Sequence, residues 1–186
     1  MSIIMHIESD DMKGLKEYYN ENIGPINEEL NKELGKYEQI KHIHIPMLKA
    51  RIIDLINTVS LLPNVNFYLH LDSVIDYVAM KEIDLFAVIN IFIDNAIEET
   101  KTQEKGKITI EMTQTNDRFI FQIKNTLNGY ESTHKPNNTH RGNEIARDIM
   151  CKYPNMASST RVEYGSYIKI LKIMNTWFFI KRDLKI

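Results

Sequence analysis

The spacing of apolar residues changes at Pro63-Asn64 from the period of a helix to that of a strand. Before this point, residues 45–62 place apolar side chains three or four positions apart, with Pro46 suited to the first turn of a helix. After it, apolar residues alternate with polar or smaller ones, as in a strand: Val65, Phe67, Leu69 and Leu71. We therefore expect a helix and a strand, with an α/β domain beginning near residues 38–46.

The N-terminal part of the chain predicts a helical arm. Apolar residues follow helical spacing in a narrow seam: Met12, Leu15, Tyr19, Ile23, Ile26, Leu30, Leu34 and Tyr37. A seam this narrow suits a helix hairpin or a dimer interface better than a helix lying on a broad core. Gly24-Pro25 predicts a kink or a new helix start. We assign residues 1–43 to this arm and residues 44–186 to the second domain.

The second domain contains a long amphipathic helix and a hairpin. Glu82–Thr100 has a helical apolar stripe, and alternating apolar residues in 107–113 and 118–124 predict two strands joined at Asn116-Asp117. Residues 125–141 contain one aliphatic side chain and predict a long loop, a type of connection that often serves as a functional lid.

After this loop, a short helix is expected over residues 143–152, followed by strands over 159–163 and 167–173 that turn at Tyr164-Gly165-Ser166. Helices and strands in this order predict a two-layer α/β (α+β) sandwich preceded by an N-terminal helical hairpin.

Composition excludes several functional classes. A formal net charge of −2 and a pI near 6.3 do not fit a general nucleic-acid surface, so we expect no nucleic-acid partner. Cys151 is the only cysteine, which excludes an intrachain disulfide and a cysteine zinc cluster and favours a reducing, cytoplasmic compartment. No apolar run reaches the roughly 18 to 20 residues that a membrane span needs.

The motif Asp94-Asn95-Ala96-Ile97-Glu98-Glu99 stands at the polar end of the long helix. An Asp-Asn pair alone is usually a cap or a solvated helix end, but here a hairpin, a polar loop and an arginine-glycine pair follow it. In this arrangement the sequence resembles the GHKL superfamily of ATP-binding domains. The resemblance implies ATP and Mg²⁺ as cofactors, Asn95 as the magnesium ligand, and Glu99 in the nucleotide-binding set. An oxygen ligand suits magnesium, which is usually held by few protein groups and by phosphate oxygens.

A second motif, Arg141-Gly142-Asn143-Glu144, stands where GHKL kinases carry their glycine-rich G box. Glycine at a helix N-terminus lets backbone N–H groups approach phosphate, and Gly142 matches the first glycine. Glu144 replaces the second glycine, and a carboxylate near phosphates is unfavourable. Lys135, Arg141 and His140 are the lid cations that the resemblance directs to the phosphates. A solvated basic loop is the alternative.

Asn125 stands where the family usually has an aspartate that accepts a hydrogen bond from the adenine amino group. Its carbonyl oxygen can still accept, without the charge. An asparagine that merely ends a strand is the alternative.

The residues favour the kinase branch of the superfamily. Hydrolytic members carry a glutamate one helical turn before the N-box asparagine, and this position is Ile91. Residues 7–23 resemble the dimerisation region of peptide-pheromone (quorum-sensing) sensor kinases, and the resemblance covers about residues 3–173. It implies a homodimer through the N-terminal helices, a response regulator as partner, and the cytoplasmic domain of a membrane receptor whose N-terminal sensor region is missing.

In that subfamily the phosphoacceptor lies in a His-Asp-Tyr-x-Asn motif, which this sequence lacks. We expect a fragment that begins after the motif and is inactive alone, since His6 is followed by Ile7 instead of an acidic residue. His42 and His44 have no third ligand nearby in the sequence, and we predict no transition metal.

The function expected from the sequence is therefore that of the ATP-binding catalytic part of a two-component sensor histidine kinase. One alternative is a degenerate GHKL pseudo-kinase that acts as a dimeric signalling module, which Glu144 favours. An anti-sigma-factor-type serine kinase is a second alternative, against which the helical arm argues.

Overall fold

The computed structural model describes residues 12–18, 20–21, 34–35, 37–127 and 139–175. The chain divides into two compact units, residues 1–38 and 39–186. The first unit contains helix α2 (Met12–Tyr18). Most of the predicted helical arm, including the expected kink at Gly24-Pro25, lies outside the described residues.

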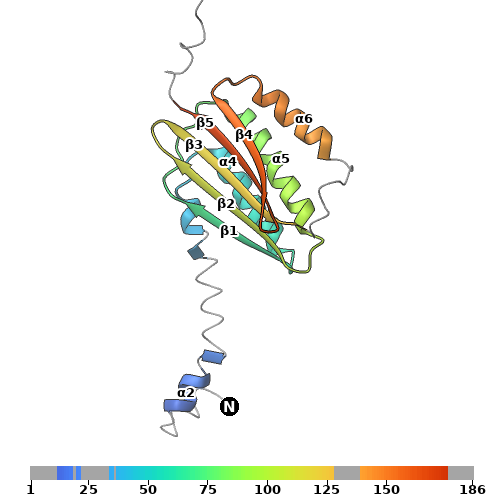
Figure 1. Cartoon of the computed structure of the whole chain (residues 1–186). Coiled ribbons are helices and arrows are strands. Elements are labelled where there is room, and N and C mark those ends of the chain that lie inside the picture. Colours follow the sequence, from blue (N-terminus) through green and yellow to red (C-terminus); the bar gives the residue numbers. More distant parts are fainter. Residues whose placement is uncertain (1–11, 19, 22–33, 36, 128–138, 176–186) are drawn as a thin grey trace, which may run out of the picture. The chain divides into compact units, whose positions relative to one another are not determined.

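The second unit is built on one mixed sheet of five strands in the order β1-β2-β3-β5-β4 (Figure 1). Strands β1 and β2 are parallel, and the remaining neighbours are antiparallel. The strands are β1 (Val65–Leu71), β2 (Gly106–Gln114), β3 (Arg118–Thr126), β4 (Met156–Glu163) and β5 (Ser166–Met174). The helices are α4 (Pro46–Ser60), α5 (Glu82–Thr100) and α6 (Thr139–Met150). Helix α5 lies in the crossover from β1 to β2, which a parallel pair requires.

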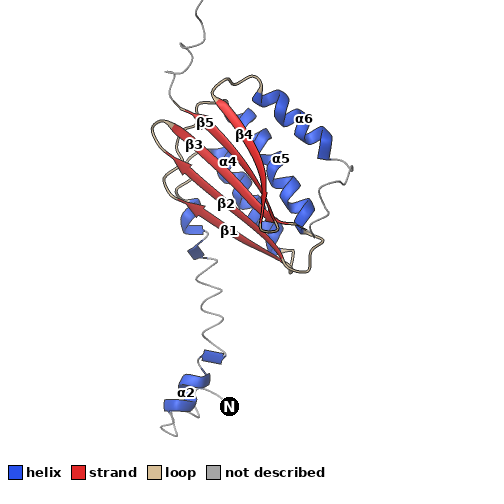
Figure 2. Ribbon diagram, in the orientation of Figure 1, coloured by secondary structure: helices blue, strands red, loops and turns tan. Residues whose placement is uncertain are grey.

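Helices and sheet form two layers around one core (Figure 2). Helices α4 and α5 contact the sheet, and α6 packs beside α5. Every second residue of β3 is buried, because alternate side chains of a strand point to the same face. The core joins these strand residues to the apolar stripes of the helices, and includes Leu48, Ile52, Leu55, Leu85, Ile89, Phe92, Ile93, Ile110, Phe121 and Leu171. The predicted two-layer α/β sandwich is confirmed.

Two expected boundaries around the long loop were wrong. β3 continues to Thr126, so Asn125 lies inside the strand and pairs with Ile108 on one side and Tyr167 on the other. Hydrogen bonds to two neighbouring strands extend β3 past the point where its apolar alternation ends. Helix α6 begins at Thr139 and not at residue 143, so Arg141 and Gly142 are helical. The remainder of the expected lid, residues 128–138, lies outside the described residues.

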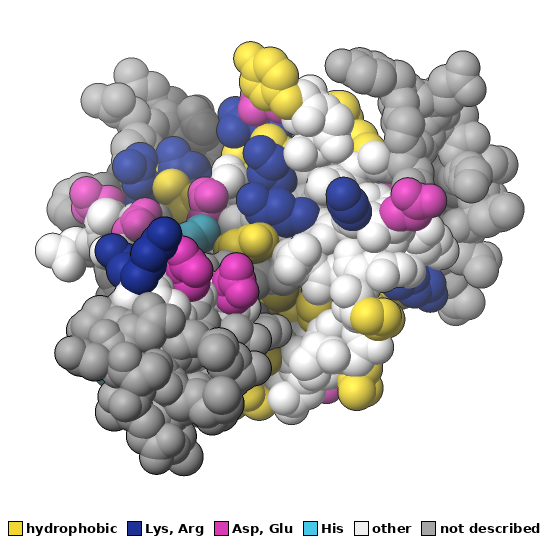
Figure 3. Space-filling model, turned by 90° about the horizontal axis from the view of Figure 1, so that it is seen from below, with side chains coloured by type: hydrophobic (Ala, Val, Ile, Leu, Met, Phe, Trp, Pro, Cys, Tyr) yellow, Lys and Arg dark blue, Asp and Glu magenta, His cyan; other side chains and the backbone are white. Residues whose placement is uncertain are grey.

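One face of the described surface carries side chains of both charges (Figure 3). In the face drawn in Figure 3, Lys and Arg side chains are interspersed with Asp and Glu side chains. The edge strand β4 is exposed and carries an ion pair between Arg161 and Glu163 (3.3 Å). Charges on an edge strand discourage pairing with another sheet. None of the described helices is long and apolar enough to cross a membrane.

Candidate functional site

Asn95 lies where α5 meets α6. Phe92 and Ala96 are buried on α5, and helical spacing places Asn95 at the margin of this stripe, where it is partly exposed. Its Nδ2 donates a hydrogen bond to Oδ1 of Asn143 on α6, with 3.5 Å between the two atoms. The structure therefore brings Asn95 of the first motif into contact with Asn143 of the second motif.

Lys169 joins this pair from the sheet. It stands opposite Ile123 on β3, and therefore faces the helices. Its Nζ donates to Oδ1 of Asn143 (2.8 Å) and lies 4.0 Å from the centre of the Phe92 ring. A polar cluster of Asn95, Asn143 and Lys169 thus connects α5, α6 and β5. Our sequence reasoning missed Lys169, although a lysine in register with the buried Leu171 and Ile173 was a visible signal.

The ammonium group of Lys169 is in an unusual environment for a charge. The residue is 9% exposed, and it forms no ion pair with any residue that the structure describes. Burial lowers the pKa of Lys169 to about 8, because removal from water disfavours the charged form. Perturbed ionisable groups of this kind are frequent at functional sites.

Asn125 lies at a second corner, where the end of α5 meets the end of β3. It is 3% exposed, and its Nδ2 donates to the carbonyl oxygen of Thr126 (3.0 Å). The buried Gln103, which the sequence did not single out, donates through Nε2 to the same Thr126 oxygen (2.8 Å) and to the carbonyl oxygen of Glu99 (3.0 Å). Gln103 therefore holds the C-terminal end of α5, with Glu99, at the strand end that carries Asn125.

Gly142 lies in the first turn of α6 and faces Ile91 of α5. A Cβ atom at Gly142 would lie 3.4 Å from Cγ2 of Ile91, an ordinary van der Waals distance. No described atom therefore requires a glycine here. Glu144, one position further along than Asn143, is exposed, so its carboxylate is solvated. Arg141 is in the same turn, and only its backbone is described; Lys135 lies outside the described residues.

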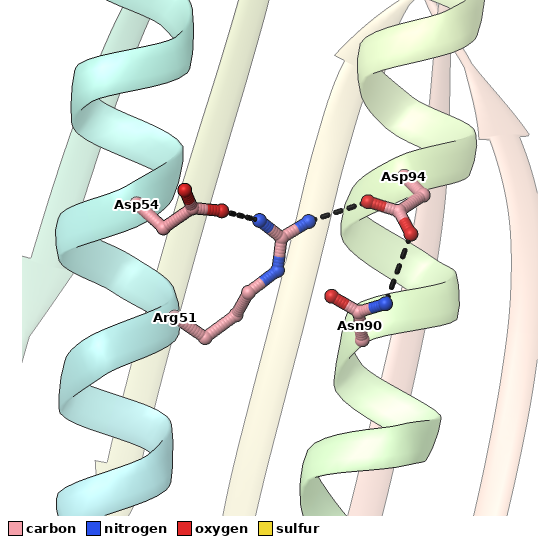
Figure 4. A network of polar contacts seen from close by, with 4 residues as sticks. All are labelled: Arg51, Asp54, Asn90 and Asp94. Atoms are coloured by element: carbon pink, nitrogen blue, oxygen red, sulfur yellow. Dashed lines mark hydrogen bonds and ion pairs between the residues drawn. The ribbon is translucent and has the colours of Figure 1, made fainter.

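Asp94, which precedes Asn95, belongs to a polar network between α4 and α5 (Figure 4). Arg51 of α4 donates to Oδ1 of Asp94 (2.5 Å) and to Asp54, and Asn90 donates to Oδ2 of Asp94 (3.0 Å). Partial burial raises the pKa of Asp94, an effect that Arg51 opposes. The network holds the motif end of α5 against α4, so Asp94 has a structural partner as well as a place in the motif.

None of the contacts described for His42 and His44 involves the polar cluster of Asn95, Asn143 and Lys169. His42 and His44 are exposed and flank the buried Ile43, which forms an isolated parallel bridge with Ile75. His6 lies outside the described residues. Within the described parts of the chain, no group of three or more His, Cys, Asp or Glu side chains is arranged to hold a metal ion.

Comparison with known proteins connects this site to one family model. Residues 80–150 match a model described as the GHKL domain. This segment includes α5, the β2-β3 hairpin and α6, and therefore Asn95, Asn125 and Gly142. A search of curated proteins found no match.

Solved structures of histidine kinases share the fold. The nucleotide-free catalytic domain of histidine kinase ThkA is 20% identical, with a TM-score of 0.57 over 70% of this chain and 91% of that chain. Acinetobacter baumannii histidine kinase AdeS is 14% identical, with a TM-score of 0.54 over 94% and 92%. The histidine kinase domain of the Erythrobacter litoralis EL346 blue-light activated kinase is 15% identical, with a TM-score of 0.53 over 67% and 58%. The fold is therefore that of histidine kinase catalytic domains.

Proposed function

We propose that this chain is the ATP-binding catalytic part of a two-component sensor histidine kinase. The observation that carries the proposal is the contact of Asn95 with Asn143, inside the segment that matches the GHKL domain. This contact joins the two motifs that the family resemblance assigns to magnesium and phosphate.

The side-chain amides of Asn95 and Asn125 each have an oxygen atom available, one for Mg²⁺ and one for the adenine of ATP. Asn95 uses Nδ2 toward Asn143, which leaves Oδ1 as a neutral oxygen ligand for magnesium. Asn125 uses Nδ2 toward Thr126, which leaves Oδ1 to accept a hydrogen bond from the adenine amino group. When bound, magnesium neutralises charge on the nucleotide phosphates. The residues present therefore fit a magnesium nucleotide.

The remaining roles are assigned to the start of α6 and to the loop before it. Gly142 in the first turn of α6 lets a phosphate approach backbone N–H groups at the positive end of the helix. Arg141 and Lys135 supply positive charge to the phosphates, and Glu99 lines the nucleotide site from α5. Ile91 provides no carboxylate to activate water, which favours transfer of the phosphoryl group to a protein over hydrolysis.

We propose that the phosphoryl group passes first to a histidine of a dimerisation helix. It is then transferred from that histidine to a response regulator. ThkA, which shares this fold with a TM-score of 0.56 over 93% of this chain and 55% of that chain, has been crystallised in complex with the response regulator TrrA. The resemblance of residues 7–23 supports a homodimer and the peptide-pheromone receptor subfamily, with the domain on the cytoplasmic side. Because the sequence has no phosphoacceptor motif, this chain alone should incorporate no label from ATP.

The second candidate is a pseudo-kinase that keeps the fold and acts as a dimeric signalling module. Glu144 in place of the second glycine favours it. The two candidates differ in nucleotide affinity, which gives a direct test.

The test is calorimetric titration of the chain with ATP and ADP in the presence of Mg²⁺. Asn95→Ala should weaken ATP binding by at least roughly tenfold, or about 1.4 kcal/mol, because a magnesium ligand is lost. Asn57→Ala, at an exposed position of α4, is the matched control and should bind as the unchanged chain does. Absence of binding by the unchanged chain would reject the kinase site and favour the pseudo-kinase.

A further inference from the structure

Lys169 is a buried cation whose described partners are neutral. Its ammonium group contacts Oδ1 of Asn143 at 2.8 Å and the face of the Phe92 ring at 4.0 Å. A charge taken out of water is costly unless an opposite charge compensates it, and no described carboxylate pairs with Lys169. Within the described residues, the fold therefore places a positive charge without a paired anion beside the Asn95–Asn143 pair.

Most charged side chains of the two motifs are negative, opposite in sign to Lys169. Asp94, Glu98 and Glu99 surround Asn95 in the sequence, and Glu144 follows Asn143. A nucleotide polyphosphate carries several negative charges, so the carboxylates of Glu98, Glu99 and Glu144 oppose its binding, whereas Asp94 is paired with Arg51. Fixed positive charge inside a partly desolvated site compensates such repulsion more strongly than charge on a solvated loop.

We propose that the ammonium group of Lys169 binds a phosphate group of the nucleotide. An ammonium has three N–H donors, and one of them is used by Asn143, so two are available to phosphate oxygens. Lysine binds phosphate as a point charge and needs no particular orientation of the anion. The inference rests on the proposed function, since it assigns a further ligand to the same site.

Asn143 acts in this arrangement as a positioning residue. Its Oδ1 accepts from Asn95 and from Lys169, so it holds the magnesium ligand and the cation at a common point. A phosphate group bound beside Asn95 would thereby lie within reach of Lys169. The sequence alone does not indicate that Lys169 belongs to this site, because all of β4 lies between the second motif and β5, which carries Lys169.

The test compares ligands that differ only in phosphate. Calorimetry with adenosine, AMP, ADP and ATP, with Mg²⁺ present, is carried out on the unchanged chain, Lys169→Met and Lys169→Arg. Lys169→Met should weaken ATP and ADP binding at least roughly tenfold while adenosine binding is unchanged, and Lys169→Arg should restore part of the loss because it keeps the charge. Lys172→Met, on the opposite face of β5, is the control and should bind all four ligands normally.

The outcomes separate the two proposals. If the unchanged chain binds none of the ligands, the proposed function fails and this inference with it. If the unchanged chain binds ATP in an Asn95-dependent manner and Lys169→Met binds it equally well, only the role of Lys169 is wrong. An equal loss for adenosine and ATP would show that Lys169 merely supports the fold, and would also overturn the inference.

A second measurement needs no variant. Phe92 and Asn143 face Lys169 from α5 and α6, and Ile123 and Thr160 are its neighbours in register on β3 and β4, so no titratable group is among them. ATP affinity of the unchanged chain should fall between pH 7.5 and 9.5 as Lys169, whose pKa is lowered to about 8, loses its proton. Adenosine affinity should not change. Affinity for ATP that is constant over this range would contradict the proposed contact.

Discussion

Arg51 of α4 and Asp94 of α5 form an ion pair with 2.5 Å between Nη2 and Oδ1, one residue before Asn95 (Figure 4). The two partners differ in environment. The side chain of Arg51 is 8% exposed, whereas that of Asp94 is 51% exposed. Within the described residues, Nε of Arg51 has no hydrogen-bond partner. The network therefore depends on the carboxylates to compensate a buried guanidinium, and the two ends should respond differently to substitution.

Removal of both carboxylates, in Asp54→Ala with Asp94→Ala, should lower the free energy of unfolding by about 3 kcal/mol, because Arg51 is left buried and unpaired. Arg51→Met should cost only about 1 kcal/mol, because water can solvate the two exposed carboxylates. Urea denaturation of each variant measures the difference. Adding Arg51→Met to the double variant should recover stability, and failure to recover it would contradict the charge argument.

Gly142→Ala should leave the free energy of unfolding unchanged or raise it by up to about 1 kcal/mol. Among the described residues, the new methyl group meets only Ile91, at contact distance, and alanine favours the helix. Its ATP affinity should nevertheless fall, because the methyl group occupies space that a phosphate needs near the backbone. Thermal denaturation with and without ATP and Mg²⁺ measures both effects.

Gly106→Ala is the contrasting control for that substitution. A Cβ atom at Gly106 would lie 2.3 Å from Cγ2 and 3.0 Å from the carbonyl oxygen of Thr100, so backbone must move. A loss of about 1 to 3 kcal/mol is expected. Equal free energies of unfolding for Gly106→Ala and Gly142→Ala would show that the space around each glycine does not determine the effect of the added methyl group.

Lys169→Met should make the chain more stable at neutral pH, because a buried charge is removed. The pKa of Lys169 is lowered from 10.5 to about 8 in the folded chain, so between these values the unfolded state binds more protons. Stability of the unchanged chain therefore rises with pH across this window, relative to the variant. The advantage of Lys169→Met, with an upper limit of roughly 3 kcal/mol below pH 8, should shrink toward pH 10.5. Urea denaturation at several pH values measures it, and a difference independent of pH would argue against a charged Lys169.

Tyr164→Asn should stabilise the chain by about 0.5 to 1 kcal/mol. Tyr164 and Gly165 form the two-residue turn between β4 and β5, with φ angles of +48° and +70°. Asparagine adopts positive φ at a smaller cost than tyrosine, and the side chain of Tyr164 is 99% exposed, so no packing is lost. Thermal denaturation measures the gain. Gly165→Ala should have the opposite effect, and a neutral result for both would mean that the turn carries no strain.

Local patterns predicted the elements that build the fold. The bounds of α5, Glu82–Thr100, were those expected from the sequence, because its apolar stripe repeats over several turns and few other structures fit that period. The β2-β3 hairpin was also predicted, since alternation and a turn signal agree there. The end of β3 was missed, because pairing with β5 extends the strand beyond its own apolar pattern. The start of α6 was missed because its first four residues, 139–142, carry no apolar side chain that marks a helix.

The sequence by itself determined which segments form helices and strands, and it singled out Asn95 and Gly142 as motif residues, because these patterns depend on neighbours within a few positions. The order of the elements then indicated the layered fold. Only the tertiary structure decided which polar groups meet. Asn143 lies 48 positions from Asn95 and 26 from Lys169, and Arg51 lies 43 positions from Asp94. No local spacing relates such residues. Their contacts arise because the burial of apolar stripes packs α4, α5, α6 and β5 together, and the polar side chains at the margins of those stripes then become neighbours.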